Sequence, residues 1–99
     1  MIPLETLDYA NFAPLTGHAF VATSGSISAE LRLGAVQLLG HRHPDAVRDP
    51  FSLTFAGPQG LRLPQGIYRL TSEALGDIDL FITQLGDGQK GSEFEAIFT

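Results

Sequence analysis

The feature that most constrains the fold of this chain is an alternation of apolar and polar residues with a period of two. It is clearest between residues 27 and 33, where four apolar residues alternate with three polar ones: Ile27, Ala29, Leu31 and Leu33 against Ser28, Glu30 and Arg32. Similar segments recur along the chain and are separated by short stretches rich in Gly, Pro, Ser and Asp. Period-two alternation is typical of half-buried strands, and closely spaced turn signals are typical of all-β folds. The sequence therefore predicts an all-β fold of six antiparallel strands, as a small barrel or a two-layer sandwich.

We expect these strands at residues 18–23, 27–38, 51–56, 67–71, 78–85 and 93–98. The N-terminal stretch differs, because Leu4, Leu7, Phe12 and Leu15 follow a roughly helical spacing and Asn11 is a good helix N-cap. This pattern predicts a short helical segment that lies over the core as a lid. A chain of 99 residues corresponds to one domain. We therefore expect a single domain over 1–99, with the lid at 1–17 and the β barrel or sandwich at 18–99.

The alternation in the second strand breaks at Gly34. Leu33 and Val36 both belong to the apolar set, although the step between them is odd. One extra residue at Gly34 would restore the phase, which is what a β-bulge does. A bulge glycine often has a positive φ, so we expect Gly34→Val to cost about 1–3 kcal/mol if φ is positive.

The last two strands carry the candidate interface. Their buried faces select a register in which Leu80 faces Phe98, Ile82 faces Ala96, Phe81 faces Ile97 and Thr83 faces Glu95. This register places Phe81 and Ile97 on the outer face, beside Glu93 and Glu95. Two interpretations stay open. The lid covers the apolar pair, or the four residues form an acid-rimmed patch for a protein partner or a second copy.

Charge and composition exclude several classes of function. The net charge is −5, and five of the six bases lie between Arg32 and Arg69, whereas residues 73–99 carry six acids and one lysine. A nucleic-acid surface needs clustered bases on a basic domain, so we expect no nucleic-acid partner. No apolar run approaches the roughly 18 residues of a membrane span, and the first residues do not resemble a secretory signal. The absence of cysteine suits a reducing compartment, which predicts a cytoplasmic location of the bacterial type.

Candidate residues for chemistry are few. His41 and His43, with Asp45 close behind, could place two imidazoles on one side of an extended segment. A metal-dependent enzyme built on this loop is a remote alternative, because a third and a fourth ligand would have to come from His18, Asp49 or a carboxylate elsewhere. We expect zinc to leave stability nearly unchanged. The chain has no G-x-S-x-G nucleophile elbow and no phosphate-binding Gly-Lys-Ser/Thr loop. We therefore expect a non-catalytic protein with no cofactor and no metal.

Several segments resemble one protein family. They are 49–58, 63–70, Leu75-Gly76, Leu80-Phe81 and 94–98, with 11–17 and Phe20 upstream. Together they are similar to the domain of unknown function 6916, and the string from Pro50 to Leu70 is its most specific part. The resemblance implies no catalytic residue, and it implies an uncharacterised bacterial family of accessory proteins encoded near phage-tail-like proteins.

These observations favour a structural or assembly module that binds a protein partner. The alternative is a small-ligand-binding β-barrel. A pocket near Tyr68, with Arg69 or Arg62 at its rim, would favour that alternative, whereas a filled interior with a flat apolar patch would favour the module.

Overall fold

The computed structural model describes residues 4–40, 42, 44–46, 48–88 and 91–99. Six strands form the sheet: β1 (Ala19–Ser24), β2 (Ile27–Leu38), β3 (Phe51–Gly57), β4 (Gly66–Ser72), β5 (Gly76–Gly88) and β6 (Gly91–Phe98). Every pairing is antiparallel, and the order β1-β2-β3-β6-β5-β4 closes on itself. The all-β antiparallel prediction is confirmed. The closed order corresponds to the ring-like alternative rather than to two separate sheets.

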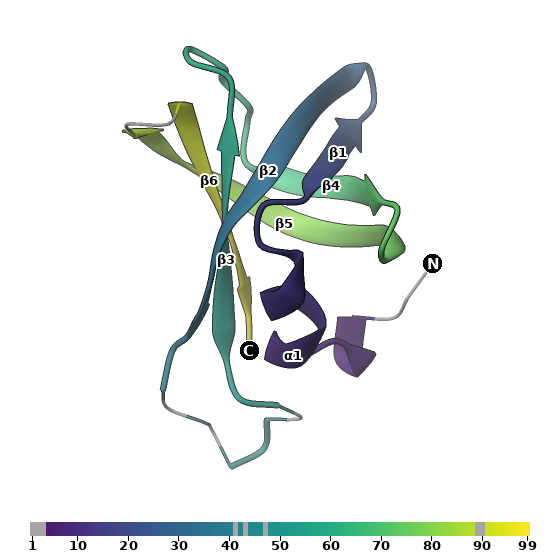
Figure 1. Cartoon of the computed structure of the whole chain (residues 1–99), viewed down its shortest axis with the longest axis vertical. Coiled ribbons are helices and arrows are strands. Elements are labelled where there is room, and N and C mark those ends of the chain that lie inside the picture. The colour runs from purple at the N-terminus through teal and green to yellow at the C-terminus, as the bar shows by residue number, and fades with distance from the viewer. Residues whose placement is uncertain (1–3, 41, 43, 47, 89–90) are drawn as a thin grey trace.

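Two long strands make this closure possible, because each changes its partner part-way along. β2 pairs with β1 from Ile27 to Arg32 and with β3 from Arg32 to Leu38. β5 pairs with β4 up to Ile82 and with β6 from Thr83 onward. Both strands have a register shift near the change, and irregularities of this kind bend a strand. In Figure 1 the ribbons of β4 and β5 accordingly cross those of β2, β3 and β6 at a steep angle.

The bulge predicted in β2 is confirmed, since the β2–β3 register shifts between Leu33 and Ala35. The positive φ expected for Gly34 is wrong, because Gly34 is not among the glycines with positive φ. A Cβ built on Gly34 would lie 3.4 Å from the carbonyl oxygen of Thr54, close to ordinary contact. The extra residue is therefore accommodated without left-handed backbone, and the strain proposed for Gly34→Val is absent. The second shift, between Gln84 and Gly86, was not predicted.

The strand boundaries differ from the prediction mainly at β5 and β6. The last two strands were expected at 78–85 and 93–98, but β5 continues to Gly88 and β6 begins at Gly91. After the register shift between Gln84 and Gly86, the pairs Asp87–Ser92 and Gly88–Gly91 continue the hairpin in a register offset by one residue. The predicted 27–38 strand has the observed bounds, and β1, β3 and β4 differ from the predicted bounds by at most one residue at each end.

The N-terminal lid is present as three short helical turns: η1 (Leu4–Thr6), α1 (Tyr9–Phe12) and η2 (Ala13–Leu15). Its N-cap is Asp8, not Asn11 as predicted. Asn11 is the third residue of the helix and completes a capping box with Asp8. Leu7, Phe12 and Leu15 are buried, and the ring of Phe12 lies 5.8 Å from that of Phe51 and 5.3 Å from that of Phe98.

Arg48 attaches the lid to the barrel end. One of its guanidinium nitrogens donates hydrogen bonds to the carbonyl oxygens of Leu4 (2.6 Å) and Leu7 (2.8 Å). The same guanidinium lies 5.0 Å from the ring centroid of Phe98, where a cation–π contact is favourable. The lid therefore closes the lower end of the ring in Figure 1, beside β3 and the C-terminal end of β6.

Candidate protein-binding face

Among the exposed large apolar side chains of β4, β5 and β6, three define the candidate face, and a fourth, Leu85, lies at the register shift of β5. Ile67 of β4 and Phe81 of β5 are directly opposite each other in the antiparallel ladder, and Ile97 belongs to β6. Their exposed fractions are 61% for Ile67, 51% for Phe81 and 57% for Ile97. We call these three residues the β4–β6 patch. Because the lid packs at the barrel end and leaves them exposed, the interpretation that the lid covers Phe81 and Ile97 is wrong.

The predicted register of the last two strands is confirmed where those strands pair. Thr83 faces Glu95, and the ladder continues from that pair to Gly88 and Gly91. Phe81 and Ile97 each lie two positions beyond this pair, on the same outer face. The pairing of β5 with β6 begins only at Thr83, so the ladder lacks the expected pairs of Leu80 with Phe98, Phe81 with Ile97 and Ile82 with Ala96. The ladder partner of Phe81 is Ile67 of β4 instead. The bend of β5 toward β4 causes this difference.

Sequence reasoning missed Ile67 as a member of the patch, although the signal was present. Ile67 alternates with Tyr68 and Leu70, which are buried, so its side chain must point outward. The alternation does not say which strand lies next to β4. Only the β4–β5 register shows that Ile67 and Phe81 form one cross-strand pair.

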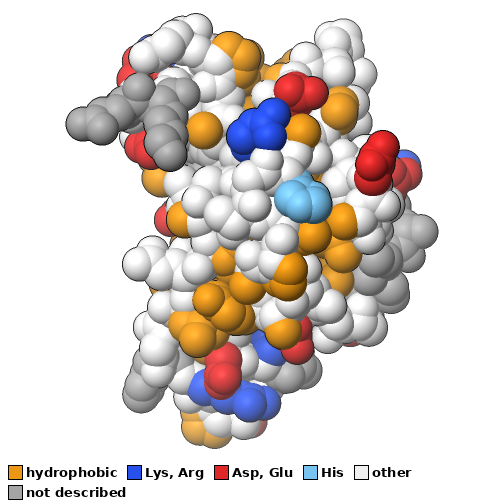
Figure 2. Space-filling model, in the orientation of Figure 1, with side chains coloured by type: hydrophobic (Ala, Val, Ile, Leu, Met, Phe, Trp, Pro, Cys, Tyr) orange, Lys and Arg blue, Asp and Glu red, His pale blue; other side chains and the backbone are white. Residues whose placement is uncertain are grey.

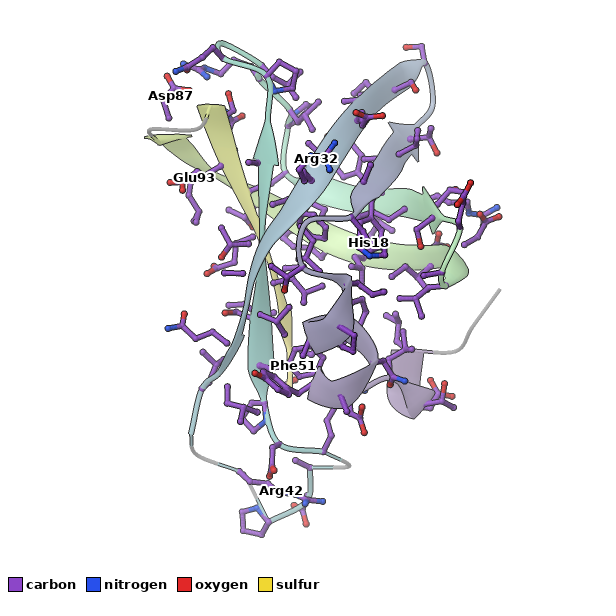
Figure 3. The ribbon with its side chains drawn as sticks, in the orientation of Figure 1. His18, Arg32, Arg42, Phe51, Asp87 and Glu93 are labelled. Atoms are coloured by element: carbon purple, nitrogen blue, oxygen red, sulfur yellow. The ribbon has the colours of Figure 1, made fainter. Side chains whose placement is uncertain are left out.

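Glu93 and Glu95, the acids predicted beside the patch, have no cationic partner among the described residues. Glu93 and Glu95 are half-buried on the outer face of β6, opposite Ala56 and Thr54 of β3. The carboxylate of Glu93 lies over Gly88, because a Cβ on that glycine would fall 2.5 Å from the Glu93 Cδ atom. Figure 3 shows Glu93 and Asp87 toward the same end of the molecule, and Arg42 at the opposite end.

Two acids of β5, Asp79 and Asp87, are paired. Arg69 Nε donates to Asp79 Oδ1 at 3.1 Å, and the pair spans β4 and β5 beside Ile67 and Phe81. Arg62 forms a bidentate pair with Asp87, with both distances 3.0 Å. Hydrogen bonding from this guanidinium lowers the pKa of Asp87, although desolvation acts in the opposite direction. These acids are largely compensated within the chain, unlike Glu93 and Glu95.

A polar network closes the barrel end beside Asp87. The Gln84 side chain accepts a hydrogen bond from the Leu63 backbone N–H at 3.0 Å and donates to the Leu61 carbonyl at 2.8 Å. The Ser92 hydroxyl is fully buried and lies 2.8 Å from the same Leu61 carbonyl. These groups satisfy one another, and the network holds the segment after β3 against the hairpin. We therefore assign it a structural role.

The feature that would favour a ligand-binding interior is not observed at Tyr68. This side chain is 2% exposed and its hydroxyl donates to the Pro64 carbonyl, so it belongs to the core. Its burial also raises the pKa of the phenol. Arg69 and Arg62, expected at the rim, are both engaged in ion pairs. Among the surface depressions in the described part of the chain, four of about 380 to 460 Å³ are half open to solvent, and none of these four is lined by Tyr68, Arg69 or Arg62.

The metal hypothesis falls largely on residues that the structure does not describe. His41 and His43 lie outside the described residues. Among the residues that are described, no three His, Asp or Glu side chains come together in a way that could hold a metal ion. Figure 2 shows His18, the described histidine, at the surface between apolar side chains.

Comparison with known proteins provides the family. The model of the family described as Domain of unknown function (DUF6916) matches residues 7–98. The chain belongs to this family. The DUF6916 match covers the lid from Leu7 and all six strands, so it agrees with the resemblance seen in the sequence. No curated protein and no solved structure matches the chain. In the described ranges of this DUF6916 domain, no helix has the length and apolar character needed to cross a membrane.

Proposed function

We propose that this DUF6916 domain is a non-catalytic protein-interaction module that binds its partner through the β4–β6 patch. The observation that carries the proposal is the exposed cross-strand pair of Ile67 and Phe81, with Ile97 on the neighbouring strand. An exposed aromatic side chain beside aliphatic ones is a frequent anchor of protein interfaces. More than half of each of these side chains remains exposed, so packing within the described part of the domain accounts for only part of their apolar surface.

The interior of the domain supports this proposal over the ligand-binding alternative. Its core is filled by large side chains, including Phe20, Phe55 and Phe94, which are at most 1% exposed. The rings of Phe20 and Phe55 meet edge to face at 5.5 Å, inside the barrel. A barrel packed in this way resembles other small barrels whose interiors are occupied by side chains. A binding role then has to use the outer surface.

The setting of the proposed function rests on sequence arguments. The chain has no cysteine, which suits a cytoplasmic protein, and the family resemblance implies an accessory role beside phage-tail-like proteins. We therefore propose that the domain acts in the cytoplasm and that its partner is a protein of a phage-tail-like assembly.

The test is the substitution Phe81→Glu. Because half of the Phe81 side chain is already exposed, we expect the free energy of unfolding to fall by only about 1 kcal/mol. This is half of what full burial of such a side chain contributes. The variant should stay folded by circular dichroism and lose the proteins captured by the immobilised wild-type domain. Leu39→Glu is the matched control, because Leu39 is 49% exposed and lies outside the patch, after β2. The proposal is wrong if Phe81→Glu unfolds the domain, or if both variants capture the same proteins as the wild type.

A further inference from the structure

We infer that the segment bound by the β4–β6 patch carries lysine or arginine beside an apolar side chain. The inference rests on the proposed function and specifies the chemistry of the partner. It follows from the charges around the patch and from the area that the patch offers.

The charge around the patch is negative after internal ion pairs are removed. Arg69 is paired with Asp79 and Arg62 with Asp87. Asp77, Glu93 and Glu95 have no ion pair within the described residues. Asp77 accepts a hydrogen bond from the hydroxyl of Thr71 at 2.8 Å and also attracts the guanidinium of Arg69, so its charge is partly compensated. The outer face of β6 thus presents two carboxylates, Glu93 and Glu95, that no cation of the described residues pairs with, and cationic side chains of a partner complement them.

A second copy of the chain would fit this face poorly. In a two-fold contact the same face meets itself, so the carboxylates of one copy would approach those of the other. Another face of a second copy would offer few unpaired cations to the patch. Arg42 lies 3.8 Å from Asp49, and Arg48 donates hydrogen bonds to the lid. Arg32 is exposed and has no ion pair in the described part of the chain, but it is a single charge.

The area of the patch also favours a short segment over a stable dimer. Three half-exposed side chains offer roughly 300 Å² of apolar surface, if each retains about half of its area. A stable protein–protein interface buries about 800 Å² on each partner. The patch therefore suits one or two apolar side chains of a bound segment, with the flanking cations near Glu93 and Glu95.

The experiment is a selection of displayed random peptides on the immobilised full-length chain, with peptides that also bind Phe81→Glu removed. We expect the enriched peptides to combine an aromatic or large aliphatic residue with lysine or arginine, and to bind more weakly at high salt. The double variant Glu93→Gln/Glu95→Gln should weaken their binding by about two- to twentyfold, as two exposed ion pairs would. Glu73→Gln is the control, because it removes the same kind of charge from the turn between β4 and β5, away from the patch.

The outcomes separate this inference from the proposed function. Peptides that depend on Phe81 but are neutral or acidic would overturn the inference and leave the proposed function standing. Self-association that is seen by sedimentation and lost in Phe81→Glu would identify a second copy as the occupant, which also overturns the inference. If neither a peptide nor another copy binds through Phe81, the proposed function itself is wrong.

Discussion

The close approach of β3 to the β5–β6 hairpin makes Gly91→Ala the most informative test of the fold. Gly91 is buried at the start of β6 and has a φ of +126°, where side chains other than that of glycine are strained. A Cβ built on it would lie 2.1 Å from the carbonyl oxygen of Gly57, far inside the closest contact that real Cβ atoms make. The substitution therefore combines backbone strain with a clash against backbone.

The surroundings prevent an easy relaxation of this clash. Gly57 pairs with Ser92 at the end of the β3–β6 ladder. Its own α-carbon is crowded, because a Cβ there would lie 2.8 Å from Leu61, 3.1 Å from Leu31 and 3.2 Å from Phe94. Neither backbone can move without disturbing the core. Strain of about 1–3 kcal/mol and overpacking of about 1–3 kcal/mol predict a total cost of about 2–6 kcal/mol.

The assay is urea or thermal unfolding of Gly91→Ala beside Gly25→Ala. Gly25 also has a positive φ, +58°, but a Cβ there would meet nothing within 4 Å. The control therefore reports the backbone strain alone. A cost of this size lowers the melting temperature of a domain of this length by about 10 °C or more. If the two variants unfold at the same denaturant concentration, the clash with Gly57 is not real and the described packing of the hairpin is wrong.

The remaining predictions concern the lid, the acid dependence and the bulge. Arg48→Met should cost about 1–3 kcal/mol by removing two charge-assisted hydrogen bonds to the lid, and proteolysis should then cut the N-terminal segment first. The pKa of Asp87 is lowered by Arg62, so the stability from this pair is complete at neutral pH and is lost as the pH falls below about 3.9 toward the lowered pKa. The free energy of unfolding should fall less between pH 7 and pH 3 for Asp87→Asn than for the wild type. An equal fall in the two proteins would contradict the pairing. Gly34→Ala should change the unfolding free energy by less than about 1 kcal/mol, because its φ is not positive, and a loss comparable to that of Gly91→Ala would refute this.

The sequence alone determined the elements, since they depend on local periodicity. Alternation from Ile27 to Leu33 predicted β2, and the odd step at Gly34 predicted its bulge, because one extra residue reverses the face of every later side chain. The same rule predicted that Thr83 faces Glu95 and that Phe81 points outward. These inferences need only the direction of successive side chains along one strand.

The tertiary structure decided what those faces meet. Closure of the ring makes β5 leave β6 and join β4, so Phe81 is paired with Ile67, and no local pattern encodes that neighbour. Arg48 lies 41 residues from Leu7 in the chain, yet it holds the lid carbonyl of that residue. Alternation shows which way a side chain points, whereas its partner depends on contacts between distant segments that exist only once the sheet has closed. The sequence therefore predicted that Phe81 and Ile97 point outward, whereas only the closed sheet places Ile67 beside Phe81.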